Sequence, residues 1–164
     1  MLDIKNPIEA RKVIRKNEYR NQTAGTANKY VQGNLCILPS KYAMDFASFC
    51  QKNPKPCPLI GFGTKGDPSL KDLGDIDIRT DVPQYRIWEK GKIIDEPYDI
   101  KKYWNEDLTT FVLGCSMSFE LPLIEAGIPI QHIKNDTIDS LIRRADQGLY
   151  KAKKNGRNRA ETVS

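Results

Sequence analysis

The chain has 164 residues, enough for one ordinary domain, and its 39% hydrophobic and 29% charged residues are typical of a soluble globular protein. No apolar run approaches the ~20 residues that cross a bilayer, and the charged N-terminus lacks the apolar core of a signal peptide, so we expect a cytoplasmic protein with no membrane partner. The net charge is only +5, and no aromatic residues alternate with the basic ones of the tail, so nucleic acid is not an expected partner.

The first third of the chain predicts a helix, a buried strand and a second helix. Asn6 can cap the first helix, and Pro7 suits its first position. The apolar run 35–38 indicates a buried strand. Ser40 is expected to cap the second helix, which has apolar residues at three- and four-residue steps and ends at Asn53.

The middle of the chain predicts short strands and little helix. A strand is expected to begin at Leu59, and strands at 85–88 and 92–94 form a hairpin that turns at 90–91. Asp99 is expected to cap a short helix.

The pattern after residue 108 predicts a strand, a tight turn and a helix. Residues 109–113 are β-branched and aromatic enough for a central strand. The helix is expected at about 118–126, with Pro122 in its first turn and Gly127 at its end.

The cysteines and the single histidine give no familiar metal-binding pattern. No C-x-x-C pair occurs, and a zinc site would need an unusual set of ligands. We therefore expect buried, reduced thiols and no metal or cofactor. The residues concerned are Cys36, Cys50, Cys57, Cys115 and His132.

Residues 110–120, TFVLGCSMSFE, are the strongest candidate for chemistry. A strand, a tight turn and a helix can aim backbone N–H groups at an anion, and Gly114 allows a close approach. Ser116 and Ser118 add hydroxyl groups, and Glu120 can act as an acid or base. The alternative is a plain strand-to-helix connection with serine N-caps.

Two further segments carry candidate binding residues. In 75–86, DIDIRTDVPQYR, arginines lie among aspartates, which can form either a charged pocket or a solvated salt-bridge network. In 23–35, TAGTANKYVQGNL, glycines bracket small and amide side chains, as in a ligand-contacting loop. The spacing of a dinucleotide-binding fingerprint is absent.

These strings, in order with FCQKNPKPCPL and a final EAGIPIQH, resemble the bacterial hydro-lyase family related to D-glutamate cyclase. The resemblance runs from about residue 8 to residue 132, and Met117 departs from the aromatic residue usual in the family. It implies an α/β domain over 1–134, with a mixed sheet flanked by helices. Family members continue well beyond this segment, so the domain is expected to be incomplete.

The resemblance also implies a lyase that releases water from a small amino or hydroxy acid, with conversion of D-glutamate to 5-oxo-D-proline as the best single candidate. Chemistry, rather than the resemblance, suggests the roles. The predicted catalytic residues are Glu120, Asp81 and Ser116. The predicted substrate-binding residues are Arg79, Arg86, Gly114, Cys115, Ser118, Thr23, Gln32 and Asn34. Two alternatives are an enzyme inactivated by truncation and a non-enzymatic module that binds small acids.

The last thirty residues, 135–164, form a second predicted region. The string RRADQGLYKAKKNGRNR resembles the final helix of a GGDEF, or diguanylate cyclase, domain, but the GG(D/E)EF signature is absent, so no cyclase activity is expected. A gene fusion explains this junction. Ile142 and Leu149 lie on the apolar face of the predicted helix, which needs a partner surface on the domain or in a homodimer.

Overall fold

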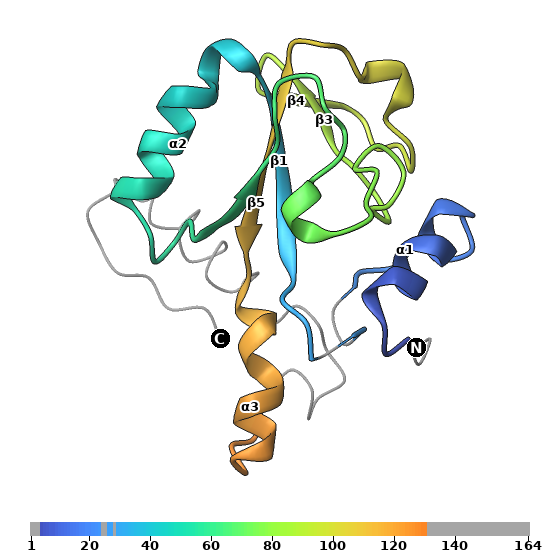
Figure 1. Ribbon diagram of the computed structural model, residues 1–164, viewed down its shortest axis with the longest axis vertical. Helices are drawn as coiled ribbons and strands as arrows, with labels where there is room; N and C mark the ends of the chain where they lie inside the picture. The colour runs from blue at the N-terminus through green and yellow to red at the C-terminus, as the bar shows by residue number, and fades with distance from the viewer. Residues whose placement is uncertain (1–3, 24–25, 28, 131–164) are drawn as a thin grey trace, which may run out of the picture. The chain divides into compact units, whose positions relative to one another are not determined.

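The computed structural model describes residues 4–23, 26–27 and 29–130, which belong to two compact units that divide after Phe119 (Figure 1). The helices are α1 (Pro7–Arg15), α2 (Ala43–Lys52) and α3 (Glu120–Glu125), and the strands are β1 (Gly33–Pro39), β2 (Leu59–Phe62), β3 (Ile87–Glu89), β4 (Lys92–Asp95) and β5 (Leu108–Gly114). Single 3-10 turns occur at η1 (Ser40–Tyr42), η2 (Lys71–Leu73), η3 (Lys101–Tyr103) and η4 (Ser116–Phe119). The predicted α/β class is confirmed. No helix within the described ranges is long and apolar enough to cross a membrane.

The main sheet has the strand order β1-β5-β2, and both pairs are antiparallel. The predicted central position of the strand at 109–113 is therefore confirmed. The β1–β5 register runs without a break from Gly33 opposite Gly114 to Pro39 opposite Leu108. Since β1 and β2 both oppose β5, they run in the same direction, and α2 connects them.

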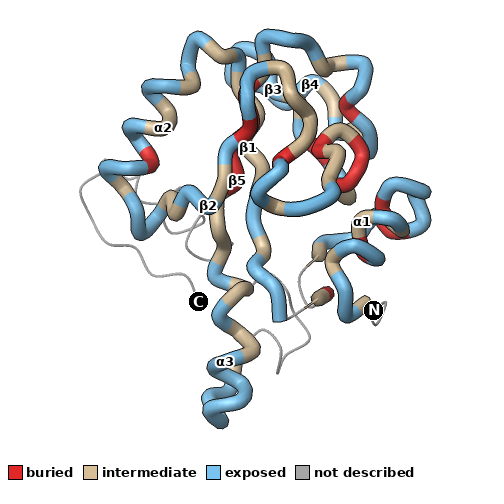
Figure 2. The backbone as a smooth tube through the Cα atoms, viewed as in Figure 1, coloured by how far each residue is buried: buried red, intermediate tan, exposed pale blue. Residues whose placement is uncertain are grey.

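The central strand β5 is buried on both faces because different segments cover each one (Figure 2). On one face, Val112 packs with Leu70 and Ile78, which both come from the long segment between β2 and β3. On the other face, Phe111 meets Phe46 of α2 edge-to-face, with ring centroids 5.0 Å apart. This double burial explains the continuous run of β-branched and aromatic residues in β5.

The two N-terminal helices begin in different ways. At α1, the Ile8 N–H donates to Asn6 Oδ1 at 2.8 Å, which confirms the predicted cap. At α2, the predicted Ser40 cap is wrong, because η1 intervenes and α2 has no side-chain cap. The N–H and hydroxyl of Ser40 both donate to the Asp107 carbonyl, at 2.7 and 2.9 Å, so Ser40 extends the β1–β5 contact instead.

The predicted hairpin is confirmed as β3 and β4, which pair antiparallel. Its turn has positive φ angles at Lys90 and Gly91, 48° and 77°, as a two-residue turn between twisted strands requires. The Lys101 N–H donates to Asp99 Oδ1 at 2.7 Å, but the helix predicted there is only the single turn η3.

The described part of the second unit covers residues 120–130. Pro122 lies in the first turn of α3, and Gly127 ends the helical segment with a φ of 76°, as predicted. The predicted domain boundary at 134 and 135, His132, and the predicted tail helix with Ile142 and Leu149 lie outside the described residues and stay predictions.

Candidate functional site

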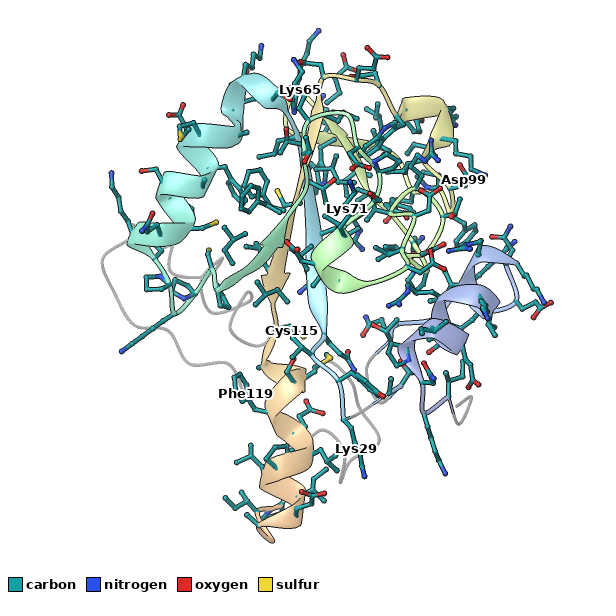
Figure 3. All side chains as sticks on the ribbon, viewed as in Figure 1. Lys29, Lys65, Lys71, Asp99, Cys115 and Phe119 are labelled. Carbon is teal, nitrogen blue, oxygen red and sulfur yellow. The ribbon has the colours of Figure 1, made fainter. Side chains whose placement is uncertain are left out.

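Hydrogen bonds join the turn after β5 to the segment before β1, although these lie 86 residues apart in sequence. The Gln32 N–H donates to Ser118 Oγ at 2.9 Å, and the Cys115 N–H donates to the Gln32 carbonyl at 3.3 Å. Gln32 Nε2 also donates to the Thr26 carbonyl at 3.0 Å, and the Thr26 hydroxyl donates to the Thr23 carbonyl at 2.5 Å. We call Thr23, Gln32, Cys115 and Ser118 the turn clamp. Figure 3 shows Cys115 at the end of β5.

Two glycines let the strands close up beside the turn clamp. Gly33 and Gly114 oppose each other in the β1–β5 register. A Cβ on Gly33 would lie 2.6 Å from Val112 Cγ1, and one on Gly114 would lie 3.3 Å from Ile60 Cγ2. Val112 and Ile60 therefore occupy the space that side chains at positions 33 and 114 would need. Glycine at position 114 is thus explained by packing.

Three further predicted residues, Asn34, Ser116 and Glu120, do not belong to the turn clamp. Asn34 is exposed and opposes Leu113 in the register. Ser116 is exposed and begins η4. Glu120 begins α3 in the second unit, so its predicted catalytic role stays a prediction.

A second group of predicted residues surrounds the buried carboxylate of Asp81. Its side chain is 0% exposed, and Arg15 of α1 binds it with two hydrogen bonds, Nε to Oδ1 at 2.7 Å and Nη2 to Oδ2 at 2.6 Å. The Asp77 N–H and the Thr80 hydroxyl each donate to it at 2.9 Å. Burial alone would raise the pKa of Asp81, but these hydrogen bonds outweigh it, and the pKa lies below the usual range. This geometry favours an anchoring role for Asp81 over proton transfer.

The two predicted arginines pair with different acids. Arg79 donates from Nε and Nη2 to Asp77, at 2.9 and 2.8 Å, and this interaction is the main reason that the pKa of Asp77 is lowered. Arg86 donates to Glu96 across the start of the hairpin at 2.8 Å, with both side chains well exposed. The segment 75–86 is thus a salt-bridge network with one buried member, Asp81.

Helix α1 connects the two groups. Arg15 binds Asp81, and the Ala27 N–H, one residue past Thr26, donates to the Ile4 carbonyl just before α1 at 2.8 Å. Within the described part of the first unit, no hydrogen bond joins the turn clamp directly to Asp81 or Arg79. Several predicted residues of the first unit are therefore brought together in two separate groups, and α1 has one contact with each region.

Three residues in these groups were missed by the sequence patterns. Arg15 has no local signal, because its partner is 66 residues away. Thr26 lies inside the motif 23–35, but the sequence carries no signal that its hydroxyl binds the Thr23 carbonyl. Tyr85 is buried, which raises the pKa of its hydroxyl, and it donates to the Ile78 carbonyl across the 75–86 loop. An aromatic residue inside a charged motif is the only signal that pointed to it.

The four cysteines are free thiols, but the expectation that they are buried holds only for Cys50, because Cys36, Cys57 and Cys115 are half-buried. Cys50 is buried in the last turn of α2, and burial raises the pKa of Cys50 and of Cys36 on β1, so both thiols stay protonated at neutral pH. Among the described residues, no group of three or more His, Cys, Asp or Glu side chains is placed to hold a metal ion.

No family model matches the sequence. A protein of Pelagibacter ubique named "Putative hydro-lyase" is 96% identical over 143 residues, which are 87% of this chain and 55% of that protein. Proteins with the same name from Verminephrobacter eiseniae and Bradyrhizobium diazoefficiens are 57% and 54% identical over 126 and 129 residues, or 76% and 78% of this chain. The chain is similar in sequence to these proteins, each of which is named a putative hydro-lyase. It spans about half the length of these relatives, 46–55%.

The similarity to the Pelagibacter hydro-lyase includes both groups of predicted site residues. A match of 143 residues leaves 21 of the 164 outside it, so positions 22 to 143 fall inside wherever the match begins. Thr23 and Glu120, the first and last of the predicted site residues, lie within these limits. Both groups, the turn clamp and the surroundings of Asp81, thus belong to the part that resembles a hydro-lyase.

The lowered pKa of Asp81 predicts how the stability of this protein depends on pH. In an unfolded chain an Asp has a pKa of ~3.9, so as the pH falls through this value the unfolded state binds a proton before the folded state does. The stabilisation by Asp81 is therefore present above about pH 5 and is lost as the pH falls towards the lowered pKa. Thermal melts from pH 7 to pH 3 should show Tm falling below about pH 4.5.

The matched variant for this experiment is Asp81→Asn. It should melt at a lower temperature than the parent at pH 7, and its Tm should change less between pH 5 and pH 3. Parallel curves for parent and variant would contradict the role given to Asp81.

Proposed function

We propose that this chain supplies part of a hydro-lyase site, in which the turn clamp holds a small carboxylic or amino acid. The supporting observation is the 96% identity to a protein named as a hydro-lyase, within a segment whose predicted binding residues are joined by hydrogen bonds. Ser116 is exposed and can offer its hydroxyl group to the substrate. The Ser118 hydroxyl binds Gln32, and the N–H groups of Gly114 and Cys115 donate to the Pro58 and Gln32 carbonyls, so these residues shape the turn.

Arg79 is our candidate for the carboxylate clamp. Its pair with Asp77 uses Nε and one N–H of Nη2, and a guanidinium has five N–H donors, so three remain for a ligand. The side chain is 32% exposed, which leaves it open to a solute. Asp77 fixes the orientation of the guanidinium, which lowers the entropy cost of binding a second carboxylate.

D-Glutamate is the substrate we propose. Its α-amine would attack the side-chain carboxyl carbon, forming a C–N bond. The amine would lose a proton, a carboxyl oxygen would leave as water, and 5-oxo-D-proline would result. Glu120 is the proposed acid and base for these proton transfers. Asp81 is the second choice, since it is already bound by Arg15.

A binding module without turnover is the second candidate. The chain spans only about half the length of its relatives, so residues from the rest of the fold are candidates for completing the reaction. Under this proposal the chain binds the acid and releases it unchanged. The GGDEF-like tail, 135–164, adds no cyclase activity in our proposal, because the metal-binding and substrate-binding signature is absent from the sequence. We propose a gene fusion as the origin of this tail, although its first residues, 135–143, also fall within the match to the Pelagibacter protein.

Two measurements test these proposals. Incubation with D-glutamate, followed by chromatography for 5-oxo-D-proline, should give product from the full-length Pelagibacter hydro-lyase and reveals whether this chain also turns over. Calorimetry with D-glutamate, L-glutamate and related diacids should show binding to this chain. A rate equal to the buffer blank leaves the binding module, and no heat with any of these acids rules out both candidates. Product from GTP would overturn our view of the tail.

Ser118→Ala should weaken acid binding about tenfold, which corresponds to one lost hydrogen bond of ~1.4 kcal/mol, because its hydroxyl holds Gln32 in the turn clamp. Ser48→Ala, on the exposed side of α2, is the matched control and should bind like the parent. If the two variants bind the acid with equal affinity, the turn clamp is not part of the binding site.

A further inference from the structure

A row of aromatic rings crosses one face of the main sheet and ends in solvent. Phe49 and Phe46 of α2 stack with centroids 6.3 Å apart, Phe46 meets Phe111 of β5 at 5.0 Å, and Phe111 stacks on Phe62 of β2 at 6.5 Å. Phe111 is only 2% exposed, whereas Phe62 is 67% and Phe49 52% exposed. The cover that α2 gives to this face therefore stops before β2.

Strand β2 is also an edge strand of the sheet, since β5 is its one partner in the described strand order. Its sequence, LIGF, has no charged residue, and Leu59 is 37% exposed. Leu59 and Phe62 oppose Leu113 and Phe111, so both lie on the face that α2 covers in part. Protein edge strands are usually protected by charged side chains or by a covering element. β2 has the apolar composition of a strand that is covered.

The lengths of the relatives indicate what covers it. The Pelagibacter hydro-lyase is 96% identical over the matched segment, which includes β2 and α2, yet the match spans only 55% of that protein. Nearly the same sequence thus occurs in a chain with a large further portion. Exposed apolar strips of this kind mark surfaces that pack against other protein segments.

We propose that Phe49, Leu59 and Phe62, the α2–β2 patch, form the docking surface for the portion of the hydro-lyase chain that lies outside this match. That portion would place an apolar element beside α2, on the same face of the sheet, and extend the cover from β5 over β2. A sheet face is normally buried by such packed layers. The surface and its occupant are independent of the substrate, so this proposal stands or falls separately from the proposed function.

Hydrogen exchange followed by mass spectrometry tests the proposal without substitutions. In the full-length Pelagibacter hydro-lyase, the amides of the segment matching 59–62 should exchange at least tenfold more slowly than in this chain. The exposed hairpin 87–95 is the internal control and should exchange equally in both proteins. Equal exchange at β2 would overturn the proposal. If β2 already exchanges slowly in this chain at every protein concentration, its own residues 131–164 cover the patch and the proposal is wrong. If exchange at β2 becomes slower as the concentration of this chain rises, a second copy covers the patch and the proposal is also wrong.

A pair of substitutions gives a second readout. Phe62→Ala should leave the Tm of this chain within about 2 °C of the parent, because the ring is 67% exposed. The same substitution at the matching position of the full-length hydro-lyase should lower its Tm by at least 5 °C, because the ring would be buried there. Trp88→Ala, 60% exposed on the hairpin, should have small effects in both. Small shifts for Phe62→Ala in both proteins would also overturn the proposal.

Discussion

Replacing Arg15 by methionine should lower the Tm by about 5–10 °C at pH 7. Methionine keeps the apolar stem on α1 but removes both hydrogen bonds to Asp81, whose side chain is 0% exposed. Breaking a fully buried ion pair costs ~3–5 kcal/mol. Because the Arg15 side chain is 41% exposed, we expect a smaller loss of about 2–3 kcal/mol in the free energy of unfolding. In a protein of this size, each kcal/mol corresponds to a Tm change of ~2–4 °C.

The matched control is Arg86→Met, which removes an equally short but exposed pair with Glu96. Exposed pairs contribute ~0–1 kcal/mol, so its Tm should lie within about 3 °C of the parent. The difference between Arg15→Met and the parent should also shrink as the pH falls towards the lowered pKa of Asp81, because a protonated carboxyl group loses its charge interaction with Arg15. Similar melting of both variants at pH 7 would show that α1 is not held by Asp81.

Gly33→Ala should be the most damaging of the small substitutions in the main sheet. The new methyl group would lie 2.6 Å from Val112 Cγ1 and 3.1 Å from the Leu113 carbonyl, so a core side chain and the β5 backbone would both have to move. Overpacking of this kind costs ~1–3 kcal/mol, which corresponds to a fall in Tm of about 3–8 °C. The same movement would displace Gln32, the preceding residue, and weaken acid binding by the turn clamp.

Gly61→Ala provides the comparison within the same sheet. A Cβ there would lie 3.5–3.8 Å from three atoms of Leu73, which is ordinary van der Waals contact. Differential scanning fluorimetry should place its Tm within about 2 °C of the parent. If Gly33→Ala also melts like the parent, the closure of β1 on β5 is looser than the distances indicate.

The elements that could be predicted from sequence are those with local causes. Asn6 and Pro7 determine the start of α1 through contacts within four residues, and Lys90 and Gly91 determine the hairpin through their own φ angles. The prediction of a helix cap at Ser40 was wrong because the Ser40 hydroxyl donates to the Asp107 carbonyl, 67 residues away. No pattern near Ser40 could reveal that acceptor.

The same distinction applies to the candidate site. The motifs containing Gln32 and Ser118 were recognisable, and the structure joins them across 86 residues. The ion pairs among Arg79, Asp77 and Asp81 could not be predicted, because Arg15 binds Asp81 and Arg79 therefore pairs with Asp77. Charge spacing in one segment cannot show that a cation from another helix completes the network.

The order of strands in the main sheet has a consequence for the chain during its synthesis. β5 is the common partner of β1 and β2, yet it is the last of the three to be made. Until Gly114 has been added, β1 and β2 have no strand to pair with, and apolar side chains such as Leu35 and Phe62 have no Val112 or Phe111 to pack against. Sheets that depend on such distant contacts form slowly, and unpaired apolar strands associate with other chains. The nascent protein is thus open to aggregation from the synthesis of β1 until Gly114 has been added.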